Sequence, residues 1–176
     1  MAVLVEAISV VIKLEAIMDR YPGGFVAFKE NVPNQTLCWD DHIVRVGFMV
    51  PQDANKFIKA LEANGLRHLD NDECAVDLIK IDQVGGPVND CDWIMTGQLS
   101  IDAAEEQYVG IALLLGTDDP ELSLPVGWKY ERSLSQQFSV TRPDEMGKSL
   151  TFLRHEDGND VFHNVLTGGE VYMGRT

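Results

Sequence analysis

The stretch "VLVEAISVVIKLEAIMDRY", residues 3–21, combines the two kinds of secondary structure that decide the fold. Residues 3–12 are rich in β-branched side chains, which favour a buried strand. Leu14, Ile17 and Met18 follow at the spacing of one helical face, until the Pro-Gly-Gly of residues 22–24 ends the pattern. The sequence therefore predicts a strand over residues 3–12 that is followed at once by a helix.

Two further helices are predicted in the same half of the chain. Residues 25–32 predict a short helix, and residues 51–65 predict a longer one that begins with a proline and ends at Gly65. The longer helix has a continuous apolar stripe, which consists of Ala54, Phe57, Ile58 and Leu61. We expect this stripe to face the core.

Strands are predicted between and after these helices. Residues 36–39 and 43–49 form a hairpin pattern around the turn-forming dipeptide Asp40-Asp41. Residues 74–82 predict another strand, which ends before the Gly-Gly-Pro of residues 85–87. Helices and strands therefore alternate in the first half of the chain.

The second half is predicted to be mostly strands, beginning with residues 92–100 and 108–116. Near the end, Asp157-Gly158 and Gly168-Gly169 separate three apolar runs, and such dipeptides are strong hairpin signals. We therefore expect a C-terminal β-meander, which either extends the first sheet or forms its own. The order of elements predicts one α+β domain over residues 1–176, with a mixed or mainly antiparallel sheet and two or three helices packed on it.

Charge restricts the class of partner. The chain has 28 acidic and 14 basic residues, a formal net charge of −14. Such a field repels nucleic acid backbones and anionic lipid, so neither nucleic acid nor a membrane is an expected partner. Three cysteines do not suit a disulfide framework, and charged residues interrupt the apolar start of the chain, so we expect a cytoplasmic protein.

The most acidic part of the chain is the candidate partner-binding surface. No lysine or arginine occurs between Lys80 and Lys129. The candidate residues within this interval are Asp102, Glu105, Glu106, Asp118, Asp119 and Glu121. They predict a non-enzymatic module for a basic protein partner, in the manner of an inhibitor or immunity-like protein. The alternative is that these acids only keep the protein in solution; whether the chain forms a homo-oligomer is left open.

A second hypothesis is a small enzyme or a small-molecule-binding domain. The irregular segment over residues 125–133 offers Trp128, Tyr130 and Arg132, which together with a histidine could line a ligand site. The alternative for this segment is a loop held by one buried tryptophan.

No cofactor and no metal site are predicted. Cys74 and Cys91 flank a predicted strand and its turn, and their aspartate-rich surroundings favour packing over thiol chemistry. His155 and His163 lie on either side of a predicted hairpin turn, which places them at different heights along the two strands. Convergence of these two histidines on a metal would need a bulge or a further ligand.

Overall fold

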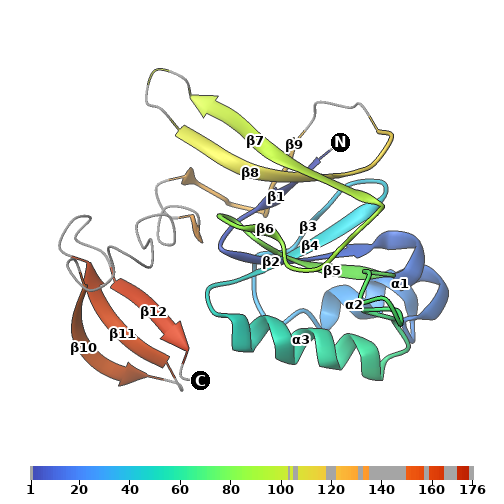
Figure 1. The fold of residues 1–176 in the computed structure, drawn as a ribbon, viewed down its shortest axis with the longest axis horizontal. Helices are drawn as coiled ribbons and strands as arrows, with labels where there is room; N and C mark the ends of the chain where they lie inside the picture. Colours follow the sequence, from blue (N-terminus) through green and yellow to red (C-terminus); the bar gives the residue numbers. More distant parts are fainter. Residues whose placement is uncertain are drawn as a thin grey trace.

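The computed structural model describes residues 2–102, 104, 107–117, 122–130, 133–134, 150–156, 159–164 and 170–174. Up to residue 134, the described part of the chain forms three layers: helices, a five-stranded sheet and a four-stranded sheet (Figure 1). The predicted α+β class is confirmed. The assignment of residues 1–176 to one domain stays a prediction.

The helical layer contains the three predicted helices: α1 (Leu14–Arg20), α2 (Gly24–Glu30) and α3 (Pro51–Ala63). In α3 the predicted stripe of Ala54, Phe57, Ile58 and Leu61 is buried. Aromatic contacts join the layer to the sheet, because the ring of Phe57 lies 6.2 Å from that of Phe28 and 5.4 Å from that of Phe48. Within the described part of the chain, no helix is long and apolar enough to span a membrane.

The five-stranded sheet is antiparallel throughout. Its strands are ordered β3 (Cys38–Trp39), β4 (Ile43–Phe48), β2 (Ile8–Lys13), β5 (Leu78–Asp82) and β6 (Gly86–Pro87). The predicted hairpin at Asp40-Asp41 is confirmed as β3–β4.

The five-stranded sheet is covered on both faces. Ile8, Val10 and Ile12 of β2 belong to the core cluster that the helices share. Val11, which points to the other face, packs in a second core cluster with strand β1 (Ala2–Val5) of the four-stranded sheet. Because side chains alternate between the two faces along β2, this one strand contributes to both core clusters.

The four-stranded sheet is mixed. Its strands are ordered β7 (Ile94–Asp102), β8 (Gln107–Leu114), β1 and β9 (Leu122–Ser123). β1 pairs antiparallel with β8 and parallel with β9. The predicted strands over residues 92–100 and 108–116 are thus confirmed as a hairpin at one side of this sheet.

The prediction of one strand over residues 3–12 is wrong, because the chain changes sheets in the middle of that run. β1 ends at Val5 and β2 begins at Ile8. Between them, Ala7 adopts a left-handed φ of 46°, a strained conformation for a residue with a side chain. Gln83 holds this corner, since its backbone N–H donates to the Ala7 carbonyl and its Oε1 accepts from the Ala7 N–H, both at 2.8 Å.

The predicted C-terminal meander is also confirmed. β10 (Leu150–Glu156), β11 (Asn159–Asn164) and β12 (Glu170–Gly174) pair antiparallel in chain order. They form a three-stranded sheet of their own and do not extend the five-stranded sheet.

Candidate functional site

A buried ion pair lies where the two larger sheets meet. Glu6, at the corner between β1 and β2, is 1% exposed, and Arg45 on β4 is fully buried. The Arg45 Nη2 lies 3.6 Å from the Glu6 Oε1. Taking two charges out of water is costly, so such a pair persists only where neighbouring groups also satisfy it.

Several neighbours hydrogen-bond to this pair, although the Arg45 Nη2 itself has no hydrogen-bond partner among the described residues. The Arg45 guanidinium donates from Nε to the Ser9 Oγ at 3.2 Å and from Nη1 to the Thr36 carbonyl at 2.9 Å. The Trp128 Nε1 donates to the Glu6 Oε1 at 2.9 Å. Burial lowers the pKa of Arg45, while nearby Cys38 and Glu6 act in the opposite direction. These contacts connect both sheets and the Trp128 segment from the inside.

The buried Glu6–Arg45 ion pair explains the position of Trp128. The indole is half-buried and packs edge-to-face on Tyr130, with ring centroids 6.5 Å apart. The indole N–H donates to the Glu6 carboxylate, which fits the alternative of a loop held by a tryptophan. Arg132 lies outside the described residues. Ligand binding by Trp128, Tyr130 and Arg132 therefore stays a prediction.

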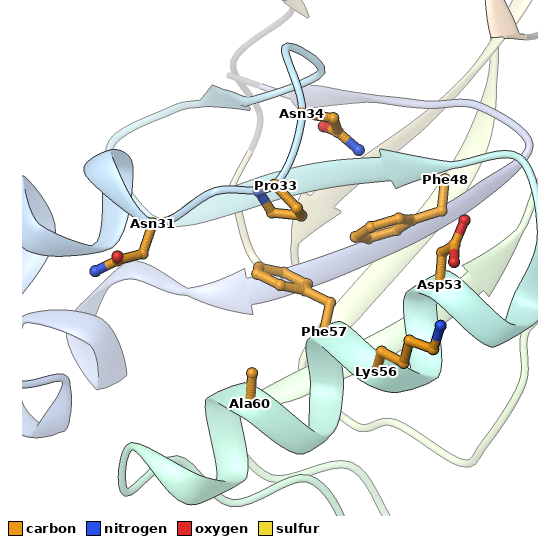
Figure 2. Close-up of a pocket in the computed structure, with 8 residues that line it drawn as sticks. All are labelled: Asn31, Pro33, Asn34, Phe48, Asp53, Lys56, Phe57 and Ala60. Carbon is orange, nitrogen blue, oxygen red and sulfur yellow. The ribbon is translucent and has the colours of Figure 1, made fainter. Parts of the chain in front are cut away.

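A groove of about 430 Å³ opens between α3, β4 and the loop after α2. Figure 2 shows Phe48 and Phe57 pointing toward each other across it, with Pro33 beside them and Asp53 and Lys56 on the helix. The remaining lining residues are Asn31, Asn34 and Ala60.

The polar groups of the groove are largely used by the chain itself. The Asn34 Nδ2 donates to the Gly47 carbonyl at 2.7 Å, and the Asn31 Nδ2 donates to the Ala27 carbonyl at 2.9 Å. Asp53 and Lys56 are exposed to solvent, where charge interactions are weak. The groove can accept an apolar group, but its lining residues do not pair a nucleophile with a base.

The hairpin β7–β8 presents a different kind of surface. Every residue of β7 from Met95 to Ser100 is exposed, and Met95 and Tyr108 expose 45% and 51% of their surface. Figure 1 shows β7 at the outer margin of the four-stranded sheet. The sequence has no charged residue between Asp92 and Asp102, and this uncharged run was the available signal for the surface. Its position at a sheet edge was not readable.

Acidic side chains gather where β7 begins. Cys74 forms an isolated parallel bridge with Asp90, and the Ala75 N–H donates to the Asp90 carbonyl at 2.8 Å. Partial burial and the carboxylates of Asp92, Asp70 and Asp90 together raise the pKa of the Cys74 thiol. Asp70, Asp90 and Asp92 are exposed, and we call these three residues the acidic cluster.

The same bridge brings Cys74 close to Cys91, although a strand and a turn separate them along the chain. Both thiols are free and half-buried, and burial raises the pKa of Cys91 as well. Raised thiol pKa values disfavour the reactive thiolate, which agrees with the preference for packing over chemistry.

The predicted partner-binding acids lie mostly outside the described residues. Asp102 is the last residue of β7, and its backbone pairs with Gln107 across an irregularity in the ladder. The other five, Glu105, Glu106, Asp118, Asp119 and Glu121, are outside the described part. Their role therefore stays a prediction.

The two C-terminal histidines do lie at different heights along their strands. His155 on β10 pairs with Asp160, whereas His163 on β11 pairs with Thr151. In the described part of the chain, no group of three or more His, Cys, Asp or Glu residues is arranged to hold a metal ion.

Comparisons with protein-family models, with curated proteins and with solved structures found no match to this chain. Function is therefore inferred from the chain's own geometry and charge.

Proposed function

We propose that this chain is a non-enzymatic protein-binding module for a basic partner, in the manner of an inhibitor or immunity-like protein. The observation that supports this is the β7–β8 hairpin, where an uncharged strand is exposed from Met95 to Ser100 beside the acidic cluster.

The hairpin has the side chains that protein interfaces use. Met95, Leu99 and Tyr108 are large, apolar or aromatic, and exposed. Methionine and tyrosine are enriched at protein interfaces, and aromatic residues often contribute most of the binding energy. Leu99 pairs with Val109 and Tyr108 pairs with Ser100, so the two side chains lie on opposite faces of the hairpin. We expect a partner that sits at the β7 edge to contact both of them.

Charge selects the partner. A net charge of −14 attracts basic proteins from a distance and raises their association rate. The acidic cluster places part of this charge next to the exposed strand, where a bound partner would meet it. A basic partner is therefore favoured over an acidic one.

The experiment is quantitative capture of partners from native cell extract, comparing wild type with a Leu99→Ser, Tyr108→Ser variant. The matched control is Val26→Ser on α2, a change at a side chain that is 65% exposed. We expect the hairpin variant to lose a basic partner that the control retains. Equal recovery by all three proteins would contradict the proposal.

Kinetics test the electrostatic part. The association rate of a recovered partner should fall as salt rises, because exposed charges are screened beyond roughly 8 Å at physiological ionic strength. It should also fall in an Asp102→Asn, Glu105→Gln, Glu106→Gln variant. A rate unaffected by both changes would reduce the acidic interval to a solubility feature.

The groove beside α3 favours small-molecule binding as a second candidate. Its volume of about 430 Å³ is within the range of ligand pockets, roughly 300 to 1,000 Å³. A fragment screen by NMR tests it: reproducible shifts confined to Asn31, Phe48 and Phe57 would favour this candidate, and their absence would remove it.

A further inference from the structure

We propose that the basic partner binds by adding a strand to the outer edge of β7. The added segment has an uncharged centre and carries lysine or arginine at the end that lies beside the acidic cluster. This inference rests on the proposed function and names how its partner is recognised.

Within the described part of the chain, one side of the β7 backbone is not paired with another strand. β7 is the terminal strand of its sheet, and among the described residues it pairs only with β8. The Leu115 N–H donates to the Trp93 carbonyl at 2.9 Å, so Trp93 directs its backbone groups toward β8. Because this direction alternates along an antiparallel ladder, the N–H and C=O groups of Ile94, Thr96, Gln98 and Ser100 point away from β8.

This edge differs from the other edges of the two larger sheets. β3, β6 and β9 have two residues each, whereas β7 has nine. Proteins usually protect long edges with lysine, proline, charge or bulges. β7 has no charged residue and no proline from Ile94 to Ile101, and its irregularity comes only after Ser100. The edge is therefore available to another strand, as in β-strand addition.

Charge argues for a basic segment over a second copy of this chain. In an antiparallel pair of two β7 strands, residue 102 of each copy would lie toward the Asp90 and Asp92 end of the other, which brings like charges together. Each copy also has a net charge of −14. A segment with an uncharged centre and lysine or arginine at the end beside the acidic cluster avoids this repulsion and matches the strand.

The probe is a fluorescent peptide, Lys-Lys-Val-Thr-Val-Thr-Val-Lys-Lys, and the measurement is its affinity for the full chain by anisotropy. The control peptide has the same sequence with its central amides N-methylated, which keeps the charge and removes the strand donors. We expect the control to bind about tenfold more weakly or worse, because several backbone hydrogen bonds are lost. Equal affinities would show charge attraction alone and would overturn strand addition.

Variants of β7 locate the binding edge. Gln98→Pro removes an N–H that faces away from β8, a position where a strand tolerates proline. Gln98→Lys keeps the backbone N–H and adds a charge at the edge of the sheet. It replaces the proline variant in the test if that variant does not fold. The matched control is Gln35→Lys, the same change at an exposed residue of the loop before β3. Circular dichroism and thermal midpoints confirm folding.

We expect both Gln98 variants to bind the peptide about tenfold more weakly and the Gln35 variant to bind it like wild type. Unchanged binding by both Gln98 variants would overturn strand addition. The proposed function would survive that result if the Leu99→Ser, Tyr108→Ser variant still lost its captured partner. A wild-type dimer in sedimentation that Gln98→Lys abolishes would instead assign the edge to a second copy.

Discussion

The five-stranded and four-stranded sheets are built from the same kinds of strands but are covered very differently. β2, at the centre of the first, is buried from Ile8 to Ile12 between the helices and the second sheet. β7, at the margin of the second, is exposed from Met95 to Ser100. This contrast separates a strand buried on both faces from a strand exposed to solvent, and the following changes test it from the largest expected effect to the smallest.

The largest effect is expected where the two sheets join. Glu6→Ala leaves the Arg45 guanidinium buried without its carboxylate and removes the acceptor of the Trp128 N–H. Breaking a buried ion pair in this way costs about 3 to 5 kcal/mol in the free energy of unfolding. Urea denaturation measures the loss.

The control for this change replaces both charges. A Glu6→Leu, Arg45→Met variant removes the pair without leaving an isolated charge, so it should regain much of the lost stability. A Glu6→Ala midpoint equal to that of wild type would mean that apolar packing alone joins the two sheets.

The next pair of changes compares the covered face of the five-stranded sheet with the exposed strand β7. Phe57→Ala removes a ring that is 8% exposed and packs on Phe28 and Phe48, so it should cost about 3 kcal/mol of unfolding free energy. Met95→Ala on β7, measured by the same denaturation, should change it by about 0.5 kcal/mol or less. Similar costs at the two positions would remove the contrast between the sheets.

Thiol labelling compares the buried strand β3 with the half-buried segments that precede β5 and β7. Cys38 on β3 is 2% exposed and burial raises its pKa, so it should label only after unfolding. Cys74 and Cys91 are half-buried and should label in the native protein, more slowly than a free thiol because their pKa values are raised. Labelling should therefore accelerate as pH increases. Fast native labelling of Cys38 would show that the edge of the five-stranded sheet opens.

The smallest effect concerns His68, between α3 and β5. Burial and Lys80 lower its pKa below the ordinary value, with Glu62 opposing them. The folded state then binds fewer protons than the unfolded state, so stability falls as pH drops through the ordinary histidine pKa. Wild type should lose more unfolding free energy than His68→Gln between about pH 7 and pH 5.5. Identical pH profiles would contradict this.

Local patterns predicted most of the described elements, because their causes are local. The stripe containing Ala54 and Leu61 repeats at helical spacing, and Asp40-Asp41 marks a turn between two apolar runs. The change of sheet at Ala7 was missed, because β-branched residues on both sides favour a strand whichever sheet it joins.

The candidate site was less predictable for a related reason. An uncharged run beside acidic residues can be read in the sequence, but whether that run is a central or an edge strand depends on distant pairings. The same holds for Trp128, since nothing near it in the chain indicates that Glu6 accepts its N–H. The tertiary fold determines whether a strand lies at the centre or the edge of a sheet. It also determines which group pairs with a buried polar side chain.

The change of sheet at Ala7 also sets an order of assembly. The strands of the five-stranded sheet all come from residues 8–87, so that sheet can close from one continuous stretch of chain. β1 pairs instead through contacts such as Val3 with Ala112, which are slow to form because the loop between them is long. During synthesis, β1 therefore waits for β8 to leave the ribosome. A chain that stalls between residues 87 and 107 exposes an apolar strand with two open edges, the kind of intermediate that aggregates or recruits a chaperone.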